Sequence, residues 1–148
     1  MIREFQGEYR WLSNFWPCRV VLDGAVYPSV EHAYQAAKTT DPAERARIRV
    51  CATPGEAKRM GRTVKVRPDW DQVKVEVMRG LLQQKFAQEP FRSKLLATGG
   101  EELVEGNRWH DRFWGRCVCP KCGGTGQNWL GRLIMEVRAE LRTEAHVR

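Results

Sequence analysis

The sequence has none of the features that mark membrane-spanning, secreted or repeat proteins. It contains no run of about 18 apolar residues, the length that a helix needs to cross a bilayer. Its first residues, Met-Ile-Arg-Glu-Phe, lack the apolar stretch of a secretion signal. Internal repeats, low-complexity tracts and a linker that would split the chain are also missing. We therefore expect one domain over residues 1–148, with no membrane partner.

The cysteines are odd in number and clustered. The chain has five cysteines, and three of them crowd into the segment Cys117-Val-Cys-Pro-Lys-Cys122. An odd and clustered set is not the disulfide framework of a small secreted domain. We therefore expect reduced thiols and a cytoplasmic protein.

Acidic residues are in the minority, with 18 Asp and Glu against 25 Lys and Arg, which gives a formal net charge of +7. This balance favours an anionic partner, such as a phosphorylated small molecule or a nucleic acid. A charge of this size also serves solubility alone, and composition does not separate the two interpretations. Six tryptophans are many for 148 residues, and some of them are candidates for stacking on a ring system.

Apolar periodicity and turn signals predict a mostly helical α+β protein with a small N-terminal β-hairpin. Residues 1–28 look β-rich, with a strand over 16–22, a turn at Asp23-Gly24 and a returning strand over 25–27. Helices are predicted over 29–38, 42–51, from 53 onward, after Pro68 with a stripe of Trp70, Val73, Val77 and Leu81, and over 90–97. Residues 101–128 look irregular, with a short strand near Leu103. The last helix is predicted over 128–141, with a frayed tail after Arg142.

The most informative segment is the helix predicted over 29–38. Ser29 is a suitable N-cap, and an apolar stripe follows it. Glu31 and Lys38 are seven residues apart, so they lie on the same side of the helix at the border of that stripe, about 10 Å apart along its axis. In a cleft, a lysine amine with a lowered pKa can attack an anomeric carbon while a carboxylic acid moves the proton. On a solvated helix edge, the same two residues would have no such role.

Three other segments carry candidate binding groups. Asn14 lies among aromatic residues in 9–15, Asp111 and Trp114 lie in the polar and aromatic segment 107–115, and Arg62 belongs to the basic segment 45–67. Asn14 offers a hydrogen bond, Asp111 a second carboxylate, Trp114 a stacking face and Arg62 a phosphate contact. A structural turn, a structural loop and a solvated basic face are the alternatives.

The Cys-rich loop, residues 117–124, has the spacing of a zinc knuckle, because Cys119-Pro-Lys-Cys122 is followed by two glycines. Cys117 supplies a third thiol. A closed zinc site needs four ligands, and the sequence has no second Cys-x-x-Cys pair, although His110 is near. A structural zinc ion and a loop with reduced thiols therefore both remain open.

Taken in order, these motifs resemble the NADAR family, also called YbiA-like, over nearly the whole chain. No single motif is decisive, but the ordered set is specific. The motifs are Gly7-Glu-Tyr, Leu12-Ser-Asn-Phe15, Tyr27-Pro-Ser-Val-Glu-His-Ala-Tyr-Gln-Ala-Ala-Lys38, Arg59-Met-Gly-Arg62, Asp69-Trp-Asp-Gln, Lys85-Phe, Leu103-Val-Glu105, Asp111-Arg-Phe-Trp-Gly115 and Gly126-Gln-Asn-Trp-Leu-Gly-Arg. The resemblance implies a compact, predominantly helical α+β domain. Separately, we expect a monomer.

The resemblance also implies N-glycosidase chemistry, the cleavage of the bond between a ribose and a base, without a catalytic cofactor. Two substrate classes are associated with the family: ADP-ribose on guanine in DNA, and phosphorylated ribosylamino-pyrimidine intermediates of riboflavin synthesis. The basic balance favours the first slightly. Matching of motifs makes Glu31, Lys38 and Asp111 the catalytic candidates and makes Asn14, Arg62, Trp70, Trp114, Gly115 and Asn128 the substrate-binding candidates.

The expected mechanism uses Glu31 or Asp111 to assist departure of the base, while Lys38 captures the anomeric carbon as an imine that water then hydrolyses. Two rival functions remain open at this point. One is a non-catalytic reader of ADP-ribose or nucleic acid, which would not need Lys38. The other is a DNA-binding module braced by zinc at Cys117, Cys119 and Cys122.

Overall fold

The computed structural model describes residues 1–147, and the chain divides into two compact units. We call Asn14–Lys85 the hairpin unit, and Met1–Ser13 together with Phe86–Arg148 the terminal unit. The predominantly helical α+β class is confirmed, since helices dominate and the strands form only two small sheets. No helix within residues 1–147 is both long and apolar enough to cross a membrane.

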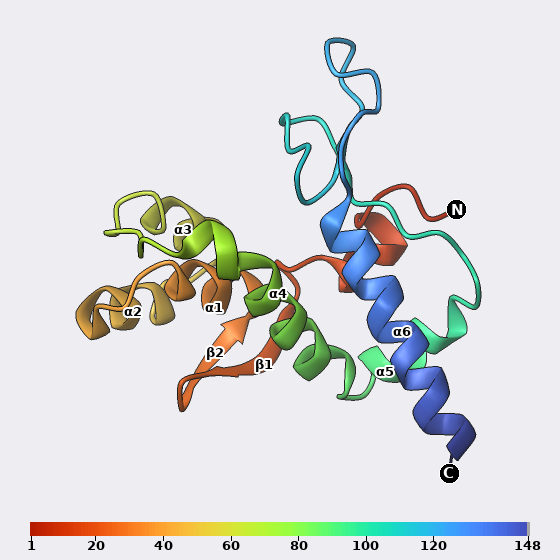
Figure 1. Ribbon diagram of the computed structural model, residues 1–148, viewed down its shortest axis with the longest axis horizontal. Helices are drawn as coiled ribbons and strands as arrows, with labels where there is room; N and C mark the ends of the chain where they lie inside the picture. The colour runs from red at the N-terminus through yellow and green to blue at the C-terminus, as the bar shows by residue number, and fades with distance from the viewer. Residues whose placement is uncertain (148) are drawn as a thin grey trace. The chain divides into compact units, whose positions relative to one another are not determined.

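The hairpin unit opens with the predicted hairpin, which Figure 1 shows in orange and red. Strand β1 (Pro17–Leu22) pairs antiparallel with β2 (Ala25–Ser29). The turn between them places Asp23 at φ 47° and Gly24 at φ 84°, the left-handed values that a tight two-residue hairpin turn requires. The Asp-Gly pair therefore predicted the turn correctly.

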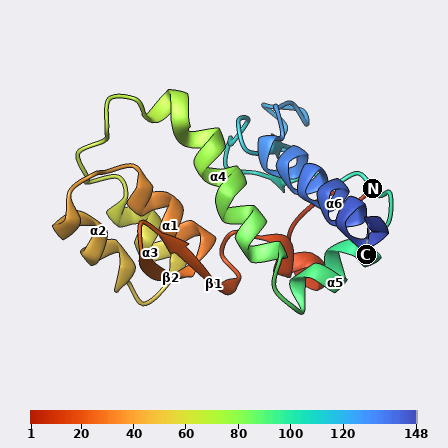
Figure 2. The same ribbon diagram turned by 60° about the horizontal axis from the view of Figure 1, so that its bottom comes forward.

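Helix α1 (Val30–Ala37) forms the centre of this unit, and every one of its residues is buried. The hairpin, α2 (Pro42–Arg49) and α3 (Pro54–Met60) pack around it (Figures 1 and 2). The predicted N-cap is confirmed, because Ser29 Oγ accepts a hydrogen bond from the backbone amide of His32 at 3.0 Å. The imidazole of His32 also lies 3.0 Å from the carbonyl oxygen of Cys51, which ties α1 to the segment between α2 and α3.

Side-chain caps also set the starts of α2 and α3. Asp41 accepts from the amide of Ala43 at 2.9 Å, and Thr53 accepts from the amide of Glu56 at 3.1 Å. Each helix then has proline in its first turn, where no backbone donor is needed. These short helices are therefore specified locally by cap residues more than by an apolar stripe.

Helix α4 (Trp70–Phe86) belongs to the hairpin unit up to Lys85, and its last residue, Phe86, belongs to the terminal unit. Its buried positions differ from the predicted stripe: Trp70 and Leu81 are buried, but Val73 and Val77 are only half-buried, and Met78 and Leu82 are fully buried. The amide of Gln84 makes two hydrogen bonds to the backbone of Val21, at 2.7 and 2.9 Å, and so fixes the end of α4 to β1.

The terminal unit is built on α6 (Trp129–Val147), with the 3-10 helix η1 (Gly7–Leu12) and α5 (Phe91–Ala97). Apolar residues at helical spacing on α6 belong to the core: Leu130, Leu133, Ile134, Val137 and Leu141 are all buried. Arg138, on the same helix, donates to Thr98 Oγ1 and to the carbonyl oxygen of Glu101, both at 2.8 Å. Two short parallel strands, β3 (Gly106–Asn107) and β4 (Arg116–Cys117), precede α6.

Three local predictions were wrong in detail. The segment before β1 is not β-rich, since it forms η1, and the strand expected near Leu103 is a single parallel bridge to Ile2. Helix α6 continues past Arg142 to Val147, where a frayed tail was expected. Local hydrogen bonds form η1, such as the one from the Ser13 amide to the carbonyl oxygen of Arg10 at 3.0 Å. Backbone pairing with the distant Ile2 decided the second outcome, and such pairing leaves no local pattern in the sequence.

Lys85, near the end of α4, is fully buried, and burial lowers its pKa to about 8, although Cys18 opposes the shift. An unfolded lysine titrates near 10.5, so between these pH values the unfolded chain binds more protons than the folded chain. The free energy of unfolding should therefore rise with pH from about 8 to about 10.5, by about 3 kcal/mol at most.

The measurement is urea denaturation across this pH range for the protein and for Lys85→Met. The variant should be more stable at neutral pH and should lose the rise, because it places no charge in the buried position. Lys65→Met, which changes an exposed lysine, should keep the rise. A rise of equal size in Lys85→Met would show that another group causes it.

Candidate functional site

Helix α1 carries Glu31 and Lys38 as predicted. Lys38 is the C-cap, with helical backbone angles of φ −63° and ψ −25°, so the two residues keep their helical spacing of two turns. Glu31 is 7% exposed and Lys38 is half-buried. The alternative of a solvated helix edge is therefore not what the fold produces.

Glu31 is held by two neighbours. Gln35, one turn along α1, donates from Nε2 to Glu31 Oε1 at 2.8 Å. The backbone amide of Glu31 donates to the carbonyl oxygen of Asn14 at 3.1 Å. A buried carboxyl group with a fixed orientation is suited to deliver a proton to one position.

The amine of Lys38 lies in surroundings that favour its neutral form. Burial is the largest cause of its lowered pKa, and the positive charges of Arg62, Lys58 and Lys74 lower it further. The negative charge of Glu31 acts in the opposite direction. A larger fraction of Lys38 is therefore neutral near pH 7 than for an ordinary lysine, and a neutral amine is the nucleophilic form.

One aromatic ring lies beside this amine, and a second ring packs against the first. Lys38 Nζ is 5.9 Å from the ring centroid of Tyr34, whose ring centroid is 5.1 Å from that of Trp70. The backbone amide of Arg67 donates to the carbonyl oxygen of Lys38 at 2.7 Å, which ties the segment before α4 to the end of α1. Trp70, predicted to contact the substrate, thus packs against the ring that lies beside Lys38.

Asn14 has an incomplete hydrogen-bond set. Its Nδ2 lies 3.6 Å from the sulfur of Met78, and among residues 1–147 its buried Oδ1 has no hydrogen-bond partner. A buried acceptor without a donor is costly, and a bound ligand that supplies a hydroxyl or amino group removes that cost. This observation supports the predicted role of Asn14 in binding.

Arg62 is exposed and close enough for its charge to act on Lys38. The glycine before it, Gly61, lies against α1, because a Cβ at this position would lie 1.9 Å from Gln35 Oε1. Gly61 therefore makes room for the glutamine that orients Glu31.

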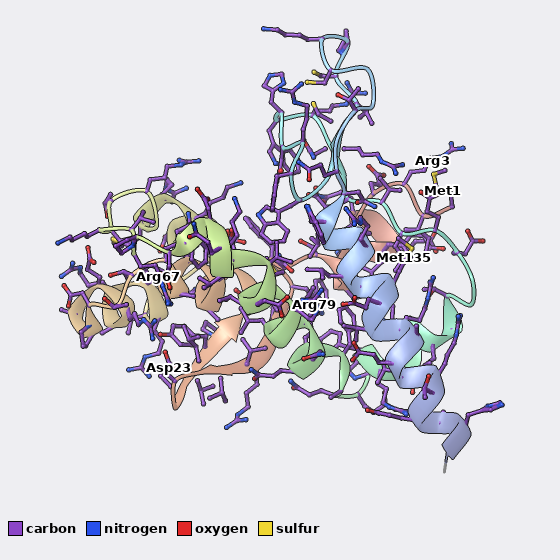
Figure 3. The ribbon with its side chains drawn as sticks, viewed as in Figure 1. Met1, Arg3, Asp23, Arg67, Arg79 and Met135 are labelled. Atoms are coloured by element: carbon purple, nitrogen blue, oxygen red, sulfur yellow. The ribbon has the colours of Figure 1, made fainter. Side chains whose placement is uncertain are left out.

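Other residues of the basic segment have acidic partners. Arg45 forms an ion pair with Asp23, and Arg67 forms one with Asp69 at 2.6 Å (both pairs involve residues labelled in Figure 3). Exposed pairs of this kind contribute little to stability. They do reduce the number of cations in segment 45–67 that can serve a phosphate.

Asp111 and Trp114 belong to the terminal unit. Asp111 Oδ1 accepts from the backbone amides of Phe113 and Trp114, at 3.1 and 2.9 Å, and so closes a tight turn. Trp114 is half-buried and packs edge-on against Phe113, with ring centroids 4.9 Å apart. Asp111 also lines an open depression of about 640 Å³, together with Arg112 and Gln127.

Gly115 and Asn128 have structural roles, and their part in substrate binding stays a prediction. A Cβ at Gly115 would lie 1.8 Å from Glu105 Oε2 and 2.1 Å from its carbonyl oxygen. Asn128 is 1% exposed; its Oδ1 accepts from the amide of Glu105 and its Nδ2 donates to the carbonyl oxygen of Leu103. These groups fasten the start of α6 to segment 103–105, and their amide and backbone atoms are used within the protein.

The three cysteines predicted as metal ligands do lie together. Cys117, Cys119 and Cys122 share a cluster with His110, and their ligand atoms all lie within 4.8 Å of one another. Figure 3 shows sulfur atoms gathered in the loop that precedes α6. The fourth ligand that a closed metal site needs is therefore present, and the cluster could hold a metal ion.

The hairpin unit thus brings together Glu31, Lys38, Trp70, Asn14 and Arg62, while Asp111 and Trp114 lie in the terminal unit. That both sets serve one site stays a prediction. Sequence reasoning missed three residues of the hairpin unit: Tyr34, Gln35 and Lys74. Helical spacing offered a signal for them, since Tyr34 and Gln35 lie one turn before Lys38, and Lys74 lies one turn after Trp70.

Comparisons with known proteins identify the family of this chain. The family model named NADAR domain matches residues 2–142. N-glycosidase YbiA of Escherichia coli is 41% identical over 142 residues, which cover 93% of this chain and 84% of that protein. Riboflavin biosynthesis protein VVA0006 of Vibrio vulnificus is 39% identical over 138 residues, but the match covers 91% of this chain and only 36% of that longer protein.

The fold is also that of a solved relative. The NMR structure of E. coli YbiA superposes with a TM-score of 0.83 at 36% sequence identity, covering 99% of this chain and 86% of that one. The family model, the relatives and the solved structure all cover most of this chain, and the motif order predicted the same assignment. The chain belongs to the NADAR family.

Proposed function

We propose that the protein is an N-glycosidase that hydrolyses the C–N bond between ribose and a base, with Lys38 as nucleophile and Glu31 as proton donor. Family membership and the name N-glycosidase, which the YbiA relatives carry, support the enzyme class. One observation carries the assignment of roles: a buried carboxyl group and an amine of lowered pKa lie two turns apart on one buried helix. A module that only binds its ligand has no need of a neutral lysine.

The first half of the proposed reaction transfers the sugar to the enzyme. Glu31 protonates the ring oxygen of the ribose, the ring opens, and the electron pair of the base nitrogen forms a C1′=N bond. The neutral amine of Lys38 adds to C1′. The base nitrogen then takes the proton that Lys38 gives up and leaves as an amine, so that a C1′=Nζ imine to Lys38 remains.

The second half releases the sugar. The Glu31 carboxylate accepts a proton from a water molecule that adds to C1′, and the resulting carbinolamine expels the amine of Lys38. The aldehyde of the sugar closes to its ring form. One water molecule is consumed, the products are the free base and the free sugar, and both residues return to their starting states. These steps are acid–base and imine chemistry, and we assign them no cofactor.

Asp111 and Trp114 complete the proposal from the terminal unit. We assign Trp114 to stacking on the base or the sugar, a contact that contributes about 1–3 kcal/mol per base where it has been measured. Since Asp111 uses Oδ1 to hold its turn, we assign Oδ2 to proton transfer at the leaving base. The division of acid and base roles between Asp111 and Glu31 is part of this proposal.

We assign binding of the substrate's phosphate groups to the cations around Lys38. The positive charges of Arg62, Lys58 and Lys74 all lower the pKa of Lys38. We call these three residues, near the end of α1, the positive surround. A phosphate there would offset their mutual repulsion. It would also partly restore the pKa of Lys38, so the substrate itself would tune how much of the amine is neutral.

Two substrate classes fit the proposal. We propose ADP-ribose attached to guanine in DNA as the substrate, since the net charge of +7 suits a polyanion. Phosphorylated ribosylamino-pyrimidines of riboflavin synthesis are the second candidate, because the Vibrio relative is named a riboflavin biosynthesis protein. That name belongs to a protein of which this chain matches only 36%, so it is the weaker support.

A covalent trap tests the chemistry. Borohydride added during turnover should reduce the imine and leave a sugar adduct on the peptide that contains Lys38, as mass spectrometry would detect. Lys38→Met should lose both adduct and turnover, and Glu31→Gln should lower kcat by about 10²–10⁴-fold, the usual contribution of a general acid. Lys65→Met, an exposed lysine outside the site, should retain both. Turnover by Lys38→Met at the normal rate would refute the imine step.

The positive surround makes a prediction about pH. Arg62→Ala removes a charge that lowers the pKa of Lys38, so this pKa should rise, and the acidic limb of the kcat/KM profile should move to higher pH. The pKa itself is measurable from the ¹³Cε shift of labelled lysine. Arg59→Ala makes the same change of charge on α3 and should leave the limb in place. An equal shift of the acidic limb in both variants would show that a change of net charge alone is sufficient to cause it.

A paired assay decides between the substrates. An oligonucleotide bearing ADP-ribosyl-guanine should be hydrolysed with the higher kcat/KM and with a steep dependence on salt, because a polyanion releases counterions when it binds. A higher kcat/KM for the ribosylamino-pyrimidine phosphate would favour the second candidate. Binding of both without turnover would indicate a reader and contradict the enzyme proposal.

A further inference from the structure

The loop that precedes α6 gathers four metal-ligating side chains around one point. His110 Nδ1 lies 3.4 Å from the sulfur of Cys122, 3.5 Å from that of Cys119 and 3.8 Å from that of Cys117. All four ligand atoms are within 4.8 Å of one another. Cys117 and Cys119 are buried, Cys122 is half-buried, and His110 is exposed at the rim.

These separations fit a tetrahedral zinc ion. With Zn–S of about 2.3 Å and Zn–N of about 2.0–2.1 Å, tetrahedral angles place nitrogen and sulfur about 3.5 Å apart. Hydrogen bonding alone accounts for less, since a neutral imidazole nitrogen has one lone pair and accepts from one thiol. Three similar contacts to Nδ1 are expected when the imidazole and the thiols surround a shared centre.

The backbone is shaped to present the thiols. The amides of Cys122 and Gly123 donate to the carbonyl oxygen of Cys119, at 3.2 and 2.9 Å, which closes the turn of a metal knuckle. Gly123 and Gly124 follow with φ values of 63° and 84° and return the chain to Cys117, whose carbonyl oxygen accepts from Gly124 at 2.7 Å. Glycine is favoured at both positions because side chains disfavour these angles.

His110 reaches the thiols from the opposite side of the loop. Its φ of 68° is left-handed, which costs a residue with a side chain about 1–2 kcal/mol. Asn107 holds this bend, since its Oδ1 accepts from the amides of Trp109 and Asp111 at 3.3 and 3.1 Å. Strand β3 pairs with β4 and so brings the histidine segment beside Cys117. Unfavourable backbone that aims a side chain is typical of a functional position.

We propose that His110, Cys117, Cys119 and Cys122 bind one Zn²⁺ ion in a closed structural site that fixes the loop carrying Asp111 and Trp114. Thiolate and imidazole ligands select zinc over magnesium or calcium. Four protein ligands fill the tetrahedron and leave no position for a reacting water, so the ion serves structure rather than chemistry.

The proposal gives the ion a defined mechanical effect. Asp111 directly follows His110 in the chain, and the carbonyl oxygens of Phe113 and Trp114 accept from the amides of Trp129 and Leu130 in the first turn of α6, at 3.0 and 2.9 Å. A metal that anchors one end of this short segment therefore also steadies the turn of Asp111 and the start of α6. Its removal should loosen segment 107–115 before it affects the core of α6.

The test uses the full chain, purified under reducing conditions without chelator. Zinc measured by mass spectrometry should be one ion per chain, and Co²⁺ replacing it should give the intense d–d bands of a tetrahedral ion together with thiolate charge-transfer bands. Cys119→Ser, Cys122→Ser and His110→Ala should each lower metal content. Cys18→Ser and Cys51→Ser, free cysteines outside the cluster, are the matched controls and should leave it unchanged.

Two readouts keep the proposal falsifiable if a variant fails to fold. Chelation of the unaltered protein should increase amide hydrogen exchange in segment 107–122 while the middle of α6 stays protected, and added Zn²⁺ should reverse this. Absence of zinc together with absence of cobalt thiolate bands in the unaltered protein would overturn the proposal. So would equal metal loss in the Cys18→Ser control. Neither readout depends on the glycosidase assignment.

Discussion

The complete burial of α1 is the constraint on which the candidate chemistry depends. A helix that bore Glu31 and Lys38 on a wet surface would hold an ordinary acid and an ordinary ammonium group. Here the hairpin and two short helices surround it, and desolvation becomes the largest influence on the pKa of Lys38. The local cap at Ser29 starts this helix at a defined residue and so fixes which side chains face which neighbours.

Burying charge in this way costs stability, and the surrounding residues show how that cost is limited. Gln35 holds the carboxylate of Glu31, and Gly61 gives Gln35 the room to do so. The cations near Lys38 oppose its protonation, which suits a nucleophile but repels any further positive charge. A phosphorylated ligand would offset both the cost of the buried charge and the repulsion among these cations. Substrate binding and stability are therefore coupled in the proposed function.

In the loops of the terminal unit that precede α6, hydrogen bonds from polar side chains hold the backbone segments that carry Asp111 and Trp114. Asn128 and Asn107 each use their amides to hold two backbone segments, and Asp111 closes its own turn. Such networks position a loop well when every member is satisfied. The proposed zinc ion extends this network at its exposed end, where a short loop has little apolar area to bury and metal ligation supplies the folding energy instead.

The sequence by itself determined the features that have local causes. The Asp23-Gly24 turn, the caps at Ser29 and Thr53 and the apolar stripe of α6 depend on backbone angles and on spacing within one element, and all were predictable. Only the tertiary structure decided what depends on distant neighbours. Local spacing does not show which distant residues cover an element. It could not establish the burial of all α1 faces, the pairing of Ile2 with Leu103, the hydrogen bonds of Asn128 or the position of His110 beside the three thiols.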